Sequence, residues 1–392
     1  MMRGGFRAAR IFGIDIYVDP SWIFIFLLVT WNLSGVVFPS LHPDWSMRLN
    51  VGLGLIASLL FFASVLAHEL SHSLMARAKG LPAGRITLFI FGGAADIGRE
   101  PPSPGSEFLI AIIGPITSAV LGSLFLAFGA LSMSDLGPGM SLPGGLESLT
   151  PVATLFFWLG PINILLAIFN MVPGFPLDGG RVLRSILWKI SKNLRLATRF
   201  ATIFGQFIAW AFIVAGAAMI FGLQVPVFGS GLVGGLWLAF IGWFLNNAAV
   251  QSYRQVVVDE MLAGVSVERL MRPDAPAAEP DVYLDELVHS YRIDRDEQAI
   301  PVVSAGRLVG MLQLEDARKV PKENWSFTRV REVMSPLNDL PLVAPLDDVS
   351  DALNKLTRSG ALQLPVVENG ALVGILRRRD ILRWLKLQSD LV

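Results

Sequence analysis

Charged residues are distributed so unevenly along this chain of 392 residues that its two parts are expected to fold in different solvents. Only 24 of the 64 charged side chains lie in residues 1–250, whereas the remaining 142 residues carry 40. An average soluble protein is about a quarter charged, a fraction that the second part reaches and the first does not. The pattern predicts a membrane domain over residues 1–250 and a water-soluble domain over residues 251–392.

Six apolar runs in the membrane domain, with at most one charged side chain each, are long enough to cross about 30 Å of hydrocarbon as helices. Loops on one side of the predicted bundle collect 13 Lys and Arg residues, whereas loops on the other side hold only Arg48. Because positively charged loops stay in the cytosol, we expect a multi-pass protein of the cell membrane, in contact with the lipid bilayer, with both termini cytosolic. The six runs are about 20–40, 51–76, 108–132, 152–172, 199–222 and 230–250.

Charge and cysteine content exclude several kinds of function. The two domains carry small and opposite net charges, so neither is predicted to bind nucleic acid. The chain has no Cys, which excludes disulfide bonds, thiolate metal ligands and a cysteine nucleophile.

Between the second and third runs lies a β-rich segment that becomes glycine-rich, Arg85–Ile97. The segment Arg10–Val18 alternates in the same way and could pair with it, which predicts a small membrane-associated β-sheet. Two interpretations remain open. The hairpin could plug the bundle, or it could bind an extended substrate by edge pairing, with Gly92 and Gly93 permitting close approach of another backbone.

The soluble domain contains an internal repeat. Each copy is too small to bury its own core, so copies at about 265–320 and 328–386 are expected to pack as a pseudo-symmetric α/β pair. The repeat resembles a tandem CBS (cystathionine-β-synthase-type) module. The matching segments are Val267–Pro273 with Val330–Pro336, and Ile300–Gly310 with Leu364–Gly374.

Two roles follow from the CBS resemblance. Modules of this kind bind adenine nucleotides such as ATP or AMP, and the resemblance implies that Asp316 and Asp380 would accept hydrogen bonds from the ribose. Gln313 and Arg377 stand where a Ser or Thr is usual, three residues before each Asp. The alternative is a module that forms a homodimer and binds no ligand.

The second apolar run carries the sequence His68-Glu69-Leu-Ser-His72. On a helix, residues four apart share a face, so both imidazoles can reach one cation while Glu69 lies beside it as a general base. Two histidines packed in a helix interface are the alternative interpretation. Charged and ionisable residues at membrane depth are costly enough that we predict a functional site here.

A catalytic zinc requires a third protein ligand and an open position for water. Pro173 and Pro176 end the fourth run and leave an irregular segment that carries Asp178, the best candidate for that ligand. Alternatively, Asp178 could cap the helix that begins near Arg181. Asn170, at the end of the fourth run, is the candidate donor to a developing oxyanion.

Together these motifs resemble the site-2 proteases, zinc-dependent intramembrane metalloproteases, and in particular those with six spans and a C-terminal CBS pair. The matching residues are His68 to His72 and Asn170 to Gly180, with Gly13–Trp22 and Gly114-Pro115 in support. The resemblance implies one Zn²⁺ held by His68, His72 and Asp178, with Glu69 as the base. Asp19 departs from the family pattern, which often has His there.

The expected activity is hydrolysis of a peptide bond in or near a transmembrane segment of a membrane-protein substrate. Two alternatives stay open: a CBS-regulated channel or transporter, and a catalytically inactive scaffold that binds metal. The first explains the spans and the tail but not the metal motif. Both alternatives predict that Glu69→Gln leaves function intact.

Overall fold

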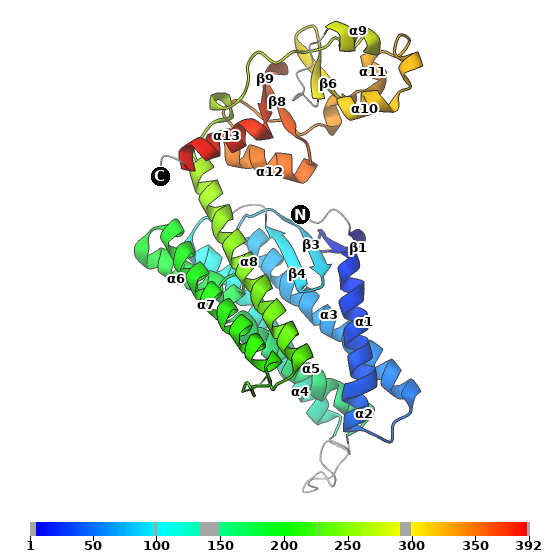
Figure 1. Ribbon diagram of the computed structural model, residues 1–392, viewed down its shortest axis with the longest axis vertical. Coiled ribbons are helices and arrows are strands. Elements are labelled where there is room, and N and C mark those ends of the chain that lie inside the picture. Colours follow the sequence, from blue (N-terminus) through cyan, green and yellow to red (C-terminus); the bar gives the residue numbers. More distant parts are fainter. Residues whose placement is uncertain (1–4, 98–99, 134–148, 227, 291–298, 390–392) are drawn as a thin grey trace. The chain divides into compact units, whose positions relative to one another are not determined.

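The computed structural model describes residues 5–97, 100–133, 149–226, 228–290 and 299–389 (Figure 1). The chain divides into two compact units, Met1–Arg254 and Gln255–Val392. The first unit is helical with one small sheet, and the second is α/β. The predicted fold class, a polytopic helical membrane domain followed by a tandem CBS domain, is confirmed.

Within the described residues, six helical segments are long and apolar enough to cross a membrane. Three of these helices are N-capped by a hydroxyl side chain. The oxygens of Ser46, Ser103 and Thr150 each accept a hydrogen bond from a backbone N–H of the first turn. The first segment combines α1 (Pro20–Asn32), a π-helical turn (Leu33–Val37) and α2 (Phe38–Leu41). The others are α3 (Met47–Ala78), α4 (Pro104–Leu131), α5 (Pro151–Asn170), α7 (Leu194–Ile220) and α8 (Leu232–Leu262).

A four-stranded sheet packs on α3 in the order β1-β2-β3-β4. The predicted pairing of the two distant segments is present, since β2 and β3 run parallel with Ile16 opposite Ile86. Buried Ile14, Ile16 and Ile86 pack against apolar side chains of α3. Among the described residues β4 pairs with β3 alone, so its outer edge has no strand partner. The strands are β1 (Phe6–Ile11), β2 (Ile14–Val18), β3 (Ala83–Phe89) and β4 (Gly92–Ile97).

The second unit shows the internal repeat as two β-β-α motifs. Each copy has its own buried cluster of aliphatic side chains, and each has a bulge at the same place, between Val302 and Val303 and between Val366 and Val367. The sheet order is β5-β6-β9-β8, with β7 (Ser335–Pro336) beside β6. Its other elements are α9 (Leu284–Ser290), β5 (Ala299–Ser304), β6 (Arg307–Gln313), α10 (Leu314–Lys319), α11 (Val330–Val333), α12 (Val349–Ser359), β8 (Gln363–Glu368), β9 (Ala371–Arg377) and α13 (Arg378–Ser389).

Candidate metal centre

Two histidines one turn apart on α3 form the first part of the site. His68 and His72 are both buried, and α4 occupies the Nδ1 atom of each ring. The Ile110 carbonyl lies 2.5 Å from His72 Nδ1, and the Ser118 hydroxyl lies 2.9 Å from His68 Nδ1. A carbonyl can only accept, so His72 donates from Nδ1 and, when neutral, presents a lone pair at Nε2.

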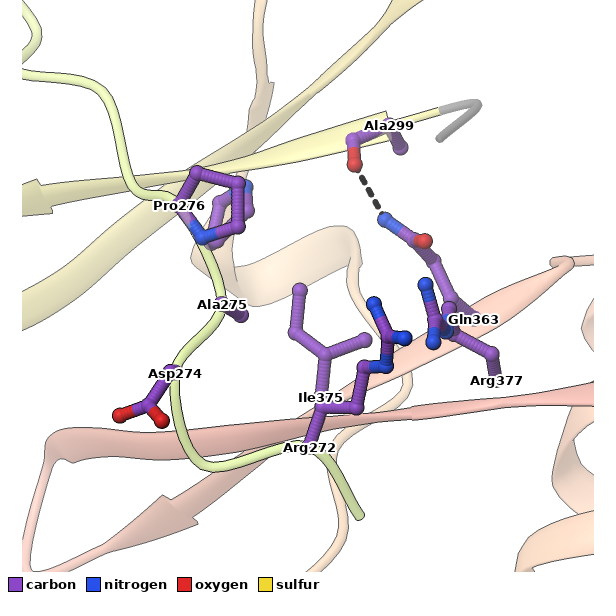
Figure 2. Close-up of a pocket in the computed structure, with 9 residues that line it drawn as sticks. Arg272, Asp274, Ala275, Pro276, Ala299, Gln363, Ile375 and Arg377 are labelled. Carbon is purple, nitrogen blue, oxygen red and sulfur yellow. Dashed lines mark hydrogen bonds between the residues drawn. The ribbon is translucent and has the colours of Figure 1, made fainter. Parts of the chain in front are cut away.

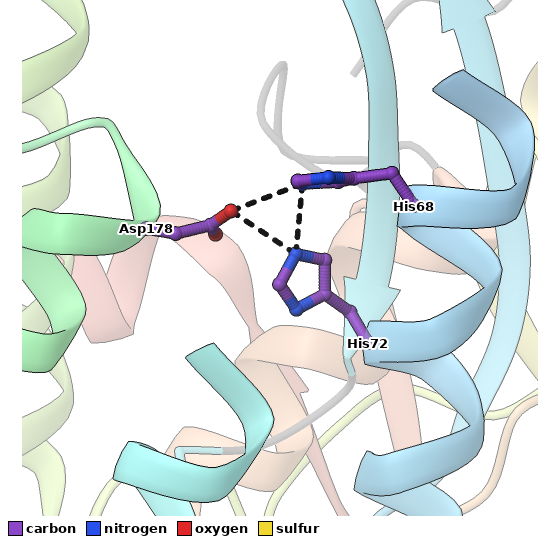
Figure 3. A group of neighbouring side chains, drawn as sticks. All are labelled: His68, His72 and Asp178. Atoms are coloured by element: carbon purple, nitrogen blue, oxygen red, sulfur yellow. Dashed lines mark hydrogen bonds and ion pairs between the residues drawn. The ribbon is translucent and has the colours of Figure 1, made fainter. Parts of the chain in front are cut away.

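Asp178 completes the cluster from α6 (Asp178–Ser191). Its Oδ2 atom lies 3.0 Å from His68 Nε2 and 3.2 Å from His72 Nε2, and the two nitrogens are 3.2 Å apart (Figure 3). Among the described residues this is the group of three His, Asp or Glu side chains close enough to share a cation. Tetrahedral zinc with bonds of about 2.0–2.1 Å separates its ligand atoms by about 3.3–3.4 Å. The triangle therefore fits zinc to within a few tenths of an ångström.

The charge state of the cluster also suits a cation. Burial would raise the pKa of Asp178, but the hydrogen bonds to His68 and His72 lower it below the usual value, so the group is a carboxylate. Without a metal, imidazole N–H groups can donate to this carboxylate; in their place, a divalent cation would bind the carboxylate oxygen and both nitrogens through lone pairs.

The backbone before α6 brings Asp178 to the histidines. Leu177, without a side-chain cap, precedes the helix, and the Asp178 carboxylate points to α3 instead of capping the first turn. Gly179 and Gly180 permit the tight fold of the preceding segment. A Cβ atom at Gly179 would lie 2.3 Å from the Met171 carbonyl oxygen, and one at Gly180 would lie 2.4 Å from Phe175 N.

Glu69 lies against β4. A Cβ atom at Gly93 would lie 2.3 Å from Glu69 Cγ and 3.4 Å from its Oε1, so the strand passes over the carboxylate at a distance that only glycine allows. Gly92, at the start of β4, adopts a φ of +124°, which disfavours any side chain. Phe91, in the turn before β4, stacks on Phe244 of α8 with ring centroids 3.9 Å apart. The structure thus places the predicted substrate strand beside the predicted base.

Asn170 ends α5, and the amide hydrogen bond that the structure shows stays within that helix. Its Nδ2 donates to the Leu166 carbonyl at 3.0 Å. Asn163, about two turns earlier on the same face of α5, is fully buried, and its side-chain amide likewise donates to the carbonyl four residues before it, that of Leu159. A donor role for Asn170 toward an oxyanion would therefore use its second amide hydrogen.

The sequence analysis cited Gly114 only as part of the family resemblance and did not predict how α4 and α6 support the site. A Cβ atom at Gly114 would lie 2.2 Å from His72 Nε2 and 2.7 Å from His68 Nε2, so this glycine is in contact with both rings. Arg184 of α6 is buried and bonds to Glu107 and Glu100. Burial disfavours the charged form of Arg184, but the two carboxylates raise its pKa above the usual value. The available signal in the sequence was Glu107, a charged residue in the first turn of the apolar helix α4 that needs a cation as its partner.

In the second unit the two predicted ribose acceptors are already paired. Asp380 Oδ2 accepts from Arg377 Nε at 2.7 Å, and Asp316 Oδ1 accepts from Lys319 Nζ at 2.6 Å. Arg377 lines a small, open pocket of about 20 Å³ between the two repeats (Figure 2). Gln363, which also lines it, donates to the Ala299 carbonyl of the other repeat. The remaining lining residues are Arg272, Asp274, Ala275, Pro276, Pro301 and Ile375.

Comparison with known proteins covers both units. The family described as Peptidase family M50 matches residues 56–148 and 129–216, and the CBS domain family matches 267–323 and 330–387. A Synechocystis protein provisionally named a zinc metalloprotease is 33% identical over 391 residues, covering 99% of this chain and 97% of its own length. A Mycobacterium tuberculosis protein with the same provisional description is 32% identical over 389 residues, covering 98% and 93%. The solved site-2 protease of Methanocaldococcus jannaschii is 27% identical and covers 63% of this chain and 94% of its own, with a TM-score of 0.40.

Proposed function

The chain belongs to peptidase family M50, the site-2 protease family of zinc metalloproteases, and from that premise we propose that it cleaves membrane-protein substrates within or near a transmembrane segment. It is a multi-pass membrane protein. The observation that carries the proposal is that two members of the metal cluster lie on a helix long and apolar enough to span the bilayer. A peptide bond that reaches this cluster must come from the membrane or its edge.

We assign His68, His72 and Asp178 as the ligands of one zinc ion. The support is the triangle of two imidazole nitrogens and one carboxylate oxygen, with both Nδ1 atoms engaged by α4. A zinc ion held there supplies a Lewis acid for the peptide carbonyl and lowers the pKa of the attacking water. Three protein ligands leave the fourth position open for that purpose.

Glu69 is assigned as the general base. It takes a proton from water as the new C–O bond forms and passes a proton to the leaving amine as the C–N bond breaks. A transmembrane helix hides its carbonyls in its own hydrogen bonds, so the substrate must unwind before attack. The outer edge of β4, which has no strand partner among the described residues, can pair with the unwound strand, and Gly93 lets β4 itself lie close to Glu69.

The test compares the wild-type protein with Glu69→Gln in cells. We would sequence the new N-termini of membrane proteins in both and measure zinc in both purified proteins. Wild type should generate N-termini within transmembrane segments, and Glu69→Gln should generate none while it retains one zinc. His68→Ala and Asp178→Ala should lose zinc, whereas Ser123→Ala, an exposed serine on α4, should behave as wild type.

Several outcomes would contradict this function. Cleavage by Glu69→Gln would remove the base, and full zinc occupancy in Asp178→Ala would remove it from the ligand set. Function that survives Glu69→Gln without any proteolysis would instead favour a regulated channel or transporter, or an inactive metal-binding scaffold.

For the tail we propose an adenine-nucleotide site in the pocket between the repeats. Arg272 and Arg377 place two guanidinium groups at this pocket, and such groups are well suited to phosphate oxygens. The Arg377–Asp380 pair means that a ribose would compete for a carboxylate that is already occupied. Binding can regulate the protease only if its affinity differs between two states of the enzyme.

Calorimetry on the full-length protein in detergent, with ATP and AMP as probes, tests the tail. We expect a Kd in the micromolar range that Asp380→Ala weakens. Glu323→Ala is the matched control, because Glu323 is an exposed carboxylate outside the residues lining the pocket and outside the predicted ribose acceptors. No heat with either nucleotide, together with a dimer that dissociates when the tail is removed, would favour homodimerisation.

A further inference from the structure

Three residues of α4 form a stripe against the two histidines. Ile110, Gly114 and Ser118 are four residues apart and so share one face of the helix. Gly114 allows the helix to come close to both imidazoles, the Ile110 carbonyl receives His72 Nδ1, and the Ser118 hydroxyl meets His68 Nδ1. One helix therefore contacts the metal-distant nitrogen of both rings.

The bond made by Ser118 differs from those of its neighbours on α4. Thr117 and Ser123 bond to the carbonyl four residues earlier in the same helix, which is the usual solution for a hydroxyl in a membrane helix. Ser118 is fully buried and its hydroxyl instead reaches across to His68 on α3. The interaction joins residues 50 positions apart and lies directly behind the proposed metal ligand.

The contacts at Nδ1 constrain the two histidines differently. Since the Ile110 carbonyl only accepts, it admits one tautomer of neutral His72. The Ser118 hydroxyl can accept or donate, but it keeps the His68 ring in one orientation, with Nε2 toward Asp178. When Nδ1–H donates to this hydroxyl, the Nε2 lone pair is free for a metal, as a ligand histidine requires.

We propose that Ser118 is a positioning residue that holds the His68 ring with Nε2 toward the zinc position and accepts the Nδ1–H of the zinc-binding tautomer. This inference rests on the proposed metal site and adds a determinant of its affinity. Without the hydroxyl, the His68 ring loses the contact that orients it, and the Nδ1–H of the zinc-binding tautomer loses its acceptor. Loss of such a supporting bond to a ligand histidine weakens metal affinity by about 10–100-fold.

The test is a zinc titration of the purified full-length protein in detergent against a fluorescent chelator. Threonine and valine have almost the same shape and differ in the hydroxyl, so Ser118→Thr and Ser118→Val form a matched pair. We expect Ser118→Thr to bind zinc within a few-fold of wild type and Ser118→Val to raise the zinc Kd by about 10–100-fold. Both should still bind one zinc at saturation.

Two further variants complete the experiment. Ser118→Ala, which adds no volume to the buried site, should weaken zinc binding as Ser118→Val does, and Ser123→Ala should leave the zinc Kd unchanged. Equal zinc affinities for the Thr and Val variants, or wild-type affinity for Ser118→Ala, would overturn the proposal. Zinc binding that responds as expected in a protein without proteolytic activity would instead refute the proposed function and leave the role of Ser118 intact.

Discussion

Arg184 is the side chain whose removal should destabilise this protein most clearly. It lies six residues after Asp178 on α6, and its side chain is only 3% exposed. Its Nε donates to Glu107 of α4 at 2.5 Å, and its Nη2 donates to Glu100 at 2.7 Å. The guanidinium also lies over the ring of Phe175, in the segment that leads to Asp178. Arg184 thus connects α6 to α4 and to Phe175 in the segment before Asp178.

The expected cost follows from which charges stay buried. Arg184→Met leaves the Glu107 carboxylate, 1% exposed, without its cation, and removal of one partner from a buried pair costs about 3–5 kcal/mol. Glu107→Gln should cost less, about 1–3 kcal/mol, because Arg184 keeps Glu100. Arg184→Met with Glu107→Leu removes both buried charges, so the double variant should be more stable than Arg184→Met alone.

The assay is reversible unfolding in mixed micelles of increasing SDS content, followed by tryptophan fluorescence, with a zinc titration of each folded variant. Lys189→Met is the control, since Lys189 is an exposed cation on the same helix. Arg184→Met should also weaken zinc binding, because α6 carries Asp178, whereas Lys189→Met should not. A free energy of unfolding within about 1 kcal/mol of wild type for Arg184→Met would refute the reasoning, as would a double variant less stable than Arg184→Met.

Three further outcomes are expected. Gly114→Ala should abolish zinc binding, because its Cβ atom would lie within 2.7 Å of both ligand imidazoles; a normal zinc content measured by atomic absorption would contradict this. Gly93→Val should stop cleavage but keep zinc, since its Cβ atom would lie 2.3 Å from Glu69 Cγ, and unchanged cleavage would exclude the close approach of β4 to the base. Cysteines introduced singly at Asp44 and Lys192 into this cysteine-free chain should react with an impermeant reagent from opposite sides of the membrane; labelling of both from the same side would overturn the topology.

Features that depend on neighbouring residues along the chain were predictable before the fold was known. Transfer of a helix into lipid is nearly a sum over consecutive side chains, so the six spans and the soluble tail could be read from hydropathy and charge. The two-histidine motif follows from helical periodicity in the same way. The repeat was visible because two segments of one chain resemble each other, as in Val267–Pro273 and Val330–Pro336.

The contacts by which these parts support one another depend on how the helices pack in three dimensions. Ser118 meets His68 across 50 residues, and Arg184 meets Glu107 across 77, because of the depth and rotation at which α3, α4 and α6 pack. No local pattern fixes those quantities, since many packings bury the same apolar faces. The contact of Gly93 with Glu69 has the same origin. A glycine in a strand can serve a turn, a bulge or a close approach, and the side chain that packs against it decides which.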